Sequence, residues 1–536
     1  MNNVPINRRQ FVLAGVGAAA LGLVGAAEAT NSDSGPTPNS ARTYSLEGPP
    51  FLTEDYQVIQ RDENDYGACR IRFGIQDKAS VLSVFIVDEA GRIWMDTQIP
   101  VEDFSPGEAG IVVKKMPVGG PYIIQVSSSE NGRKARITFR NVLVGDIWIL
   151  GGQSNMYGIA LAEEDLPALP YLNMLNPMHT HMDSQWCAGI PPLHRLPDEL
   201  AAFHLKAQYP GITDLEIKQR LAAKVPVGGI GPAYFFAKQL YEAGSDVPIG
   251  VIPCATGAAL AVWDPTKRDQ NRYGFLYHHV MTAGGRVKGM LWYQGEQDAI
   301  FGDEEKTVTQ PSLIYPMSTY AAEFKKFVDS LRSDFQNHEL VVITAQICRH
   351  HNGKKERHKF WEQMREIQRT IPDQVPNVHV VPTVDLDELD GLHLDYWSQK
   401  RLGHRMAYVA LPYVKRGAPA RTEIKLKSVN FGNTARPTIV VEFTAVSGKL
   451  RAPGRPTGFQ LRNMDTGEDL EWIFKVNFSP DDPGKVILEI AAKQEPQDNL
   501  ALLYAPGATP FVNVVDESDM ALPAFGPVAV GAPAHP

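Results

Sequence analysis

The middle of this chain alternates short, uninterrupted runs of hydrophobic residues with stretches in which hydrophobic residues recur every three or four positions. The runs predict five buried strands, over residues 142–150, 248–253, 287–293, 340–346 and 378–384. The periodic stretches predict helices over residues 233–243, 274–282, 320–335, 356–371 and 398–411. Strands that alternate with helices predict an α/β fold whose parallel sheet is covered on both faces. Sites in such sheets lie at the carboxyl ends of the strands.

The pattern on either side of this region is one of strands and turns. Residues 81–87 and 122–126 predict strands, and turn signals such as Gly119-Gly120-Pro121 separate them, which together indicate a small β-sandwich. After Pro419 we expect strands over residues 424–429, 438–443, 458–462, 485–490 and 501–504. The Pro- and Ala-rich tail that follows them is expected to dock loosely.

These changes of pattern divide the 536 residues, a length that predicts more than one domain. We expect a flexible leader over 30–50 and an N-terminal β-sandwich domain over 51–140. The α/β domain then covers 141–417, and a β-rich C-terminal domain covers 418–536.

The first 29 residues resemble a twin-arginine export signal. Arg8-Arg9 precedes a Gly- and Ala-rich apolar run, and Ala27-Glu28-Ala29 supplies the small-residue pattern of a cleavage site. A membrane anchor is the alternative, but the run is short, rich in glycine and followed by a cleavage pattern, which favours an export signal. We therefore expect a mature chain that begins near Thr30, lies in a periplasm or outside the cell, and is not stably inserted in a membrane.

Charge and cysteine content exclude several classes of function. The net charge of -9 gives no electrostatic reason to bind nucleic acid or an anionic membrane. The four cysteines, Cys69, Cys187, Cys254 and Cys348, are scattered, so a structural zinc site has little support. Export permits disulfides, and the sequence leaves their pairing open. Cys254 and Cys348 end predicted strands, where the commoner role is that of a small hydrophobic residue.

Ser154 is the first residue with candidate chemistry. It lies in Gly151-Gly152-Gln153-Ser154-Asn155-Met156, directly after the first predicted strand. Glycines there allow a sharp turn that places Ser154 at the carboxyl edge of the sheet. The pattern differs from the G-x-S-x-G elbow of α/β-hydrolases, and taken alone it is typical of a plain turn.

Asp390 and His393 follow the fifth predicted strand and supply what a serine nucleophile needs. A serine hydroxyl requires a base, and the imidazole of His393 titrates in the suitable range. A carboxylate must orient that imidazole, and a spacing of three on a loop lets Asp390 reach it. The alternative is that Asp390 caps the following turn and His393 lies on the surface.

Two further strand ends offer groups that could stabilise an oxyanion. Gln294, in Trp292-Tyr293-Gln294-Gly295-Glu296, ends the third strand, and Gly257 follows the second. The backbone N–H groups of Ser154 and Gly257 and the side-chain amide of Gln294 would give the two or three fixed donors that an oxyanion hole needs. Glu296 could bind substrate, but a role in holding the local backbone is favoured.

Together these motifs resemble the sialate O-acetylesterase family within the SGNH (GDSL-like) hydrolases. The residues that carry the resemblance are Val144-Gly145-Asp146-Ile147-Trp148, Gly152-Gln153-Ser154-Asn155-Met156, Trp292-Tyr293-Gln294-Gly295-Glu296 and Asp390-Gly391-Leu392-His393-Leu394. The resemblance implies a flavodoxin-like, three-layer core. It also implies Ser154 as nucleophile, His393 as base with Asp390 as its partner, and an oxyanion hole completed by Gly257 and Gln294. The chain departs from the family at Gly257-Ala258-Ala259 and Glu296-Gln297-Asp298, which leaves the sugar open.

The expected activity is the removal of O-acetyl groups from carbohydrate, with no metal or organic cofactor. Trp263 could stack on a sugar ring or belong to the core, and Arg349 could meet a sugar carboxylate or form a structural salt bridge. Residues 157–227 are long for a connection, and we expect an insertion that shapes the substrate site. His179 and His181 within it form a possible metal pair without an evident third ligand.

Two other functions remain open at this point. The chain could be a non-catalytic carbohydrate-binding protein with a degenerate hydrolase core, or an SGNH esterase that acts on non-carbohydrate esters in the manner of a lipase. The sequence does not predict the acetylated sugar or the oligomeric state.

Overall fold

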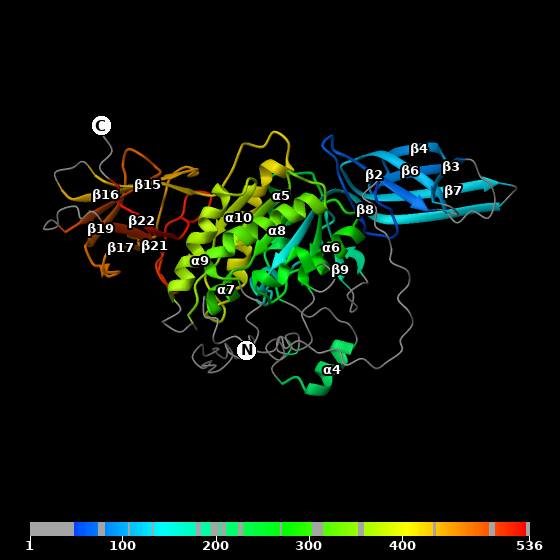
Figure 1. Ribbon diagram of the computed structural model, residues 1–536. Coiled ribbons are helices and arrows are strands. Elements are labelled where there is room, and N and C mark those ends of the chain that lie inside the picture. Colours follow the sequence, from blue (N-terminus) through cyan, green and yellow to red (C-terminus); the bar gives the residue numbers. More distant parts are fainter. Residues whose placement is uncertain are drawn as a thin grey trace, which may run out of the picture.

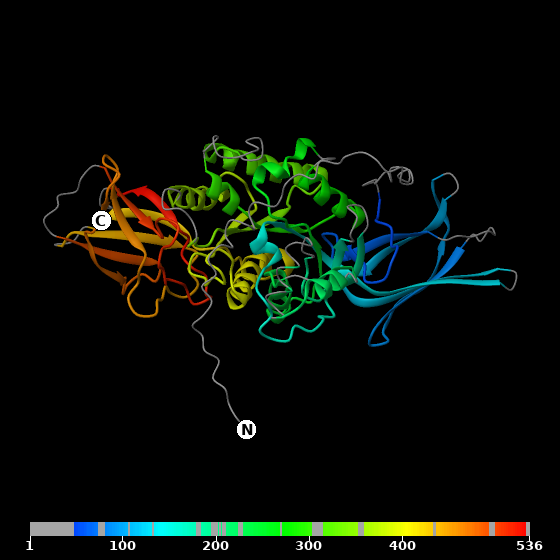
Figure 2. The ribbon, with the colours of Figure 1, turned by 90° about the horizontal axis from the view of Figure 1, so that it is seen from below.

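The structure is a computed structural model that describes residues 48–531 except 73–80, 106–107, 131–132, 178–183, 195–201, 203–204, 206–210, 223–228, 268–270, 303–314, 352–357, 433–435 and 492–498. The expected export signal and nearly all of the expected leader therefore lie outside the described residues, as do His179 and His181. Three regions follow one another along the molecule: N-terminal sheets, a central α/β region and C-terminal sheets (Figures 1 and 2).

The central sheet contains all five predicted strands. They are the second half of β8 (Arg133–Gly152), then β11 (Ile249–Pro253), β12 (Gly289–Tyr293), β13 (Val341–Gln346) and β14 (Val378–Pro382). The order across the sheet is β11-β8-β12-β13-β14, and every neighbouring pair is parallel. The chain leaves β8 toward one side and later returns on the other. The carboxyl end of β8, where Ser154 follows, is thus the switch point at which such sheets bind ligands.

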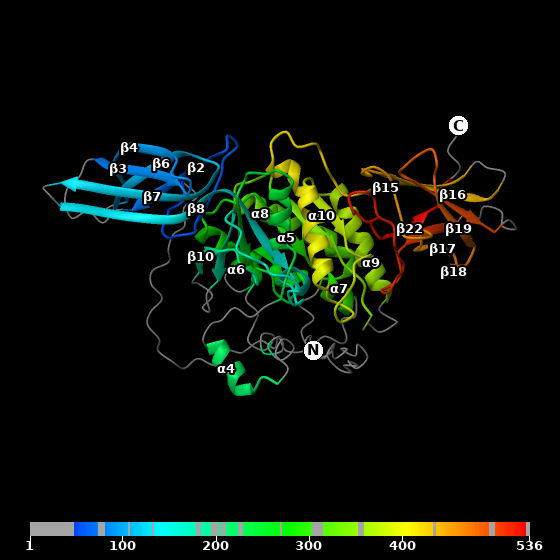
Figure 3. The same ribbon diagram turned by 180° about the vertical axis from the view of Figure 1, so that it is seen from behind.

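Helices cover both faces of this sheet. α6 (Arg272–Thr282), α8 (Tyr320–Asp334) and α9 (His358–Thr370) lie on one face, and α5 (Ala233–Glu242) and α10 (Tyr396–Val414) lie on the other (Figures 1 and 3). α7 (Glu296–Phe301) begins just after β12. Short 3-10 helices are η1 (Leu260–Trp263), η2 (Pro265–Lys267), η4 (Met317–Thr319) and η6 (Ile371–Asp373).

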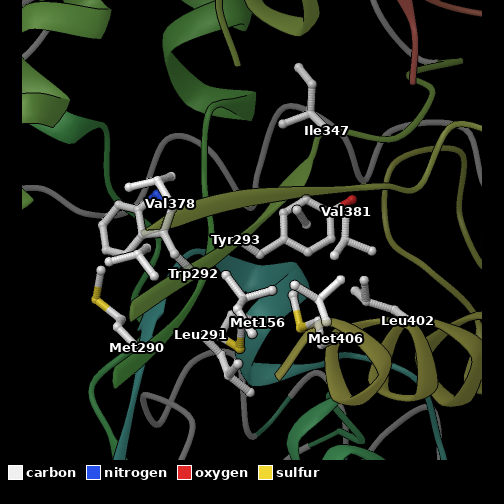
Figure 4. Packing of buried hydrophobic residues seen from close by; sticks show 14 of the residues in the cluster. Met156, Met290, Leu291, Trp292, Tyr293, Ile347, Val378, Val381, Leu402 and Met406 are labelled. Carbon is white, nitrogen blue, oxygen red and sulfur yellow. The ribbon is translucent and has the colours of Figure 1, made fainter. Parts of the chain in front are cut away.

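Buried apolar side chains fill the space between the sheet and the helices, next to the strand ends that carry the candidate residues. Met156, Leu291 and Met406 are fully buried, and Figure 4 shows their side chains packed together. They come from the helix after Ser154, from β12 and from α10, respectively. Because interiors are close-packed, this contact fixes the position of the residue that follows β8 relative to the rest of the sheet.

β8 is shared by two parts of the molecule. Its first half pairs with β7 (Gly119–Glu130), and its second half joins the central sheet. β1 (Val58–Gln60) also pairs with β8, while β3 (Val81–Asp88) pairs with both β7 and β4 (Ile93–Pro100). A separate three-stranded sheet holds β2 (Tyr66–Arg72), β6 (Glu108–Pro117) and β5 (Glu102–Ser105). The expected boundary between 140 and 141 falls inside β8.

The C-terminal region forms two four-stranded antiparallel sheets. One has the order β15-β16-β20-β19, and the other has the order β18-β17-β21-β22. Their bounds are β15 (Lys425–Phe431), β16 (Thr438–Thr444), β17 (Phe459–Asn463), β18 (Asp469–Leu470), β19 (Ile473–Phe478), β20 (Lys485–Ile490), β21 (Leu500–Tyr504) and β22 (Phe525–Ala529).

The composition of the tail suggested loose docking, but the described part of the tail, up to residue 531, is held firmly. β22 pairs with β21, and the Gln346 side chain exchanges two hydrogen bonds with the backbone of Ala524, at 2.8 and 2.9 Å. Leu522 is fully buried. Proline and alanine content is a poor guide here because apolar contacts and main-chain pairing hold the segment.

The segment expected as an insertion extends the central sheet. β9 (Leu172–Pro177) pairs parallel to β11, and β10 (Ser184–Ala188) pairs antiparallel to β9. Farther along lies α4 (Asp214–Ala222). Among the described residues, no helix has the length and apolarity needed to cross a membrane. All four cysteines are free, and Cys254 and Cys348 are buried.

Candidate active site

Ser154 opens a one-turn helix, α2 (Ser154–Tyr157), at the carboxyl end of β8. The turn requires glycine at position 152. Gly152 has a φ of 118°, and a Cβ there would lie 2.1 Å from the carbonyl oxygen of Tyr293 on the neighbouring strand. The backbone therefore passes unusually close to β12 before it turns, and the turn lifts Ser154 to the edge of the sheet.

Asp390 and His393 lie together on a tight loop between β14 and α10. Asp390 Oδ1 accepts hydrogen bonds from the backbone N–H groups of Leu392 and His393, at 3.1 and 2.9 Å. Asp390 Oδ2 lies 2.7 Å from His393 Nδ1. Gly391, with a φ of 84°, allows the chain to make this turn. The carboxylate thus holds both the loop and the imidazole.

The structure brings His393 to Ser154 across the edge of the sheet. His393 Nε2 lies 2.9 Å from Ser154 Oγ. With Nδ1 donating to Asp390, Nε2 is the ring nitrogen that can accept the serine proton. Burial raises the pKa of the Asp390 carboxyl, but the hydrogen bonds from His393 and Leu392 and the nearby imidazole outweigh burial and lower that pKa. The carboxylate is therefore ionised over the range in which an imidazole serves as a base.

Asn155 is a residue that the sequence reasoning missed. Its side chain reaches both sides of His393, because Oδ1 accepts from the N–H of Leu394 at 2.9 Å and Nδ2 donates to the carbonyl of Leu392 at 3.3 Å. Nδ2 also donates to Glu296 Oε1 at 2.9 Å. Only the position of Asn155 beside Ser154, in the quoted Gln-Ser-Asn motif, was available as a signal.

Glu296 holds the side chain of Asn155 through this hydrogen bond and does not face outward toward a substrate. It is 3% exposed, and burial raises its pKa despite the hydrogen bond from Asn155. The sequence favoured a role for Glu296 in holding the local backbone. In the structure Glu296 does have a supporting role, but the group that it holds is the side chain of Asn155. The proposed contact between Glu296 and substrate is wrong.

The two residues predicted to complete the oxyanion hole lie in different environments. Gly257 is exposed at the same edge, directly after Thr256, whose N–H donates to the Gly152 carbonyl at 2.8 Å. The Gln294 amide is instead fully buried: Nε2 donates to Asp298 Oδ2, and Oε1 accepts from the Tyr320 hydroxyl at 2.7 Å. Because those partners hold it beneath the site, the assignment of Gln294 to the oxyanion hole is corrected.

Two other predicted substrate contacts are also corrected. Trp263 is fully buried, with its ring edge-on to Trp292 at 5.1 Å, so it belongs to the core. Arg349 donates to the carbonyl of Leu386 at 2.8 Å and pairs with Glu388 at 3.3 Å. The guanidinium therefore holds the segment before Asp390 in place. Neither side chain is free to meet a sugar, since its neighbours in the fold already engage it.

The expected insertion does reach the site through His194. The N–H of Ala255 donates to His194 Nε2 at 3.3 Å, two residues before Gly257. Burial lowers the pKa of His194 to about 3, so the ring is neutral. Its ring lies 6.3 Å from that of Tyr157, in the helix that Ser154 opens. His194 thus packs against the helix that Ser154 opens, and its lowered pKa makes it a poor proton acceptor near neutral pH.

Within the described ranges, no three His, Cys, Asp or Glu side chains gather as a metal-binding group. The groups at the edge of the sheet are those of acyl transfer: a hydroxyl, an imidazole, a carboxylate and backbone N–H donors.

Comparisons with known proteins agree with this chemistry. Residues 144–412 match the model of the family described as carbohydrate esterase, sialic acid-specific acetylesterase. That span is half of the chain and contains every residue of the site. The chain belongs to this family. It is a carboxylic ester hydrolase of the carbohydrate acetylesterase kind.

Two relatives of the esterase extend the comparison. A protein of Arabidopsis thaliana named as a probable carbohydrate esterase is 26% identical over 279 residues, which cover 49% of this chain and 90% of the relative. The crystal structure of a carbohydrate acetylesterase from Xanthomonas citri aligns with a TM-score of 0.59 at 20% identity, over 89% of the esterase and 98% of that chain. The second likeness concerns the fold, and it reaches well beyond the central region.

Proposed function

We propose that the esterase is a serine hydrolase that releases acetate from O-acetylated carbohydrate through an acetyl-enzyme on Ser154. The distance of 2.9 Å between His393 Nε2 and Ser154 Oγ carries the proposal, together with the 2.7 Å contact between His393 Nδ1 and Asp390. A serine, an imidazole and a carboxylate in this order form the arrangement that activates a hydroxyl at neutral pH.

The reaction begins as His393 accepts the Ser154 proton while Oγ attacks the acetyl carbonyl carbon. The negative charge that develops on the carbonyl oxygen is stabilised by the N–H groups of Ser154 and Gly257. His393 then returns the proton to the departing sugar oxygen as the C–O bond breaks. In the second half, His393 takes a proton from water, the hydroxide attacks the acetyl group, and acetate leaves as Ser154 recovers its proton.

Several finer features belong to the same proposal. The central region is proposed to be an SGNH, flavodoxin-like three-layer core over 141–417, with β-sandwich domains at 51–140 and 418–536. The strand order around β8 supports this, because it has the pattern of that fold class. We also propose export by the twin-arginine signal at residues 1–29, on the motif Arg8-Arg9 and its apolar run.

The direct test is the Ser154→Ala variant assayed with 4-nitrophenyl acetate. Removal of the nucleophile is expected to lower kcat by about 10⁴-fold or more, with an unchanged circular dichroism spectrum and denaturation temperature. Ser333→Ala, at an exposed position of α8, is the matched control and is expected to retain full activity. Unchanged hydrolysis by Ser154→Ala would falsify the mechanism.

The substrate class needs a separate screen. Acetate release would be measured from acetylated xylan, acetylated pectin and O-acetylated sialosides, beside a series of 4-nitrophenyl esters of increasing chain length. The proposal predicts release from at least one acetylated glycan and a steep fall beyond the acetyl ester. Greater activity on long-chain esters than on any glycan would favour a lipase-like enzyme.

A further inference from the structure

An exposed tryptophan lies beside the catalytic loop. Trp397 is 45% exposed, the most of the eight tryptophans in the chain. It lies in the first turn of α10, and Asp395 caps that helix by accepting from the N–H of Ser398 at 2.8 Å. His393 is four residues earlier. An exposed indole forgoes the free energy of burial, so its place next to the site calls for an explanation.

The first turn of α10 is fixed directly to the element that carries Ser154. Gln399 Nε2 donates to the backbone carbonyl of Asn155 at 3.0 Å. The N–H of Leu394, just before the helix, donates to Asn155 Oδ1 at 2.9 Å. The start of the helix that carries Trp397 is therefore tied to the same rim as Ser154 and His393.

The indole ring is also held in one orientation. Its Nε1 donates to Glu163 Oε2 at 2.9 Å, and Lys400 Nζ lies 5.0 Å from the ring centroid. Lys400 in turn pairs with Glu164 at 2.8 Å. Glu163 and Glu164 come from the segment after the Ser154 helix, so two parts of the site hold the ring. A ring that is already ordered loses little conformational entropy when a ligand binds it.

We propose that Trp397 is a sugar-binding platform on which a pyranose ring of the acetylated substrate stacks. The apolar C–H face of a sugar suits an aromatic ring, and Trp is favoured where one part of a group is apolar and the rest meets polar partners. Glu163, at the edge of the ring, presents an acceptor for sugar hydroxyls, and Lys400, over one face of the ring, presents a donor. Exposed Leu389 lies close to His393, because its backbone N–H donates to the His393 carbonyl at 2.7 Å.

This inference rests on the proposed acetyl transfer at Ser154, and its test separates the two. Trp397→Ala would be compared with wild type on 4-nitrophenyl acetate, which has no sugar, and on glucose pentaacetate. The platform predicts a rise of about tenfold in KM for the sugar acetate, with kcat and KM for the aryl ester within twofold of wild type. Trp397→Phe, which keeps an aromatic ring, is expected to recover most of the loss.

Trp94→Ala is the matched control, because Trp94 is the other tryptophan exposed at 36% and lies on β4, in the N-terminal region. It should leave both substrates unaffected. An equal loss on both substrates in Trp397→Ala would mean that the ring only supports the fold, and no change on the sugar acetate would mean that sugars do not use it. Either outcome overturns the platform. If wild type cleaves the aryl ester but not the sugar acetate, the platform also fails, whereas inactivity on both contradicts the acetyl-transfer proposal itself.

Discussion

The side-chain amide of Asn155 holds the backbone on both sides of His393, the proposed base. It accepts from one neighbour of His393 and donates to the other, at 2.9 and 3.3 Å. These two bonds fix the backbone that carries the imidazole, while the hydrogen bond to Asp390 fixes the orientation of the ring. Because a shift of a base by an ångström costs much of the rate in such sites, we infer that Asn155 positions His393 for the proposed reaction without contacting the reacting atoms.

We predict that Asn155→Ala lowers kcat for an aryl acetate by about 10- to 100-fold with little change in KM, since the base is displaced while substrate contacts remain. Steady-state kinetics on the purified variant measure the split. The companion variant Glu296→Gln keeps an oxygen to accept from Asn155 and removes the carboxylate, so it should retain most of the activity. A large loss in Glu296→Gln would show that the carboxylate itself takes part in catalysis.

At the scale of the element, α7 begins with buried acids. Asp298 is fully buried beside Gln294, and burial raises its pKa to about 7, above the usual value of 3.8. A carboxyl with a raised pKa in the folded state binds a proton more tightly there than in the unfolded chain. Its contribution to stability is therefore fully present below pH of about 4 and is lost as the pH rises through about 7.

Asp298→Asn should accordingly be more stable than wild type at neutral pH, and the advantage should shrink as the pH falls toward about 4. The measurement is the thermal denaturation midpoint of both proteins across that range. Asp329→Asn, on the exposed face of α8, serves as the control and should show no such trend. An advantage that stays constant with pH would contradict a buried, protonated Asp298.

The elements that the sequence predicted well are those with a strong hydrophobic period. The five central strands and the long helices were predicted because their burial is nearly continuous or one-sided. β9 and β10 were missed because both strands mix polar and apolar positions; β9 pairs with β11, and β10 lies at the edge of the sheet.

Within the site, the chemical groups at the strand ends could be predicted from the sequence, but the direction of each side chain could not. Ser154, Asp390 and His393 were expected to meet, and they do. Gln294 was misassigned because Asp298 and Tyr320, the partners that draw its amide inward, lie on α7 and α8. Trp263 was ambiguous for the same reason, as its burial depends on Trp292 and other distant residues.

Across the whole molecule, the C-terminal sheets are connected to the catalytic loop through the end of β13. The buried guanidinium of Arg365 donates to the carbonyls of Cys348 and Gly507, at 2.6 and 2.7 Å. Next to Cys348, the N–H of His350 donates to Ala508, and the N–H of His351 donates to Gly391, at 2.9 and 2.8 Å. A continuous set of hydrogen bonds thus runs from the C-terminal region to the loop of His393.

We predict that Arg365→Met destabilises the protein by about 3 kcal/mol or more, because several buried carbonyls lose a charged donor. Chemical denaturation measures the stability, and 4-nitrophenyl acetate hydrolysis at low temperature should show a reduced kcat in the fraction that remains folded. Arg455→Met, at an exposed position of the C-terminal region, is the control and should have little effect on either the stability or kcat. Wild-type stability in Arg365→Met would show that the two regions are held together by other contacts.

The activation of Ser154 by His393 is the central claim, and it is tested most directly by mass spectrometry after reaction with a fluorophosphonate. The account predicts a single covalent adduct in the wild-type protein, mapped by peptide sequencing to Ser154. It also predicts that the adduct is absent in Ser154→Ala and forms much more slowly in His393→Ala. An adduct on another residue, or equally rapid labelling without His393, would contradict it.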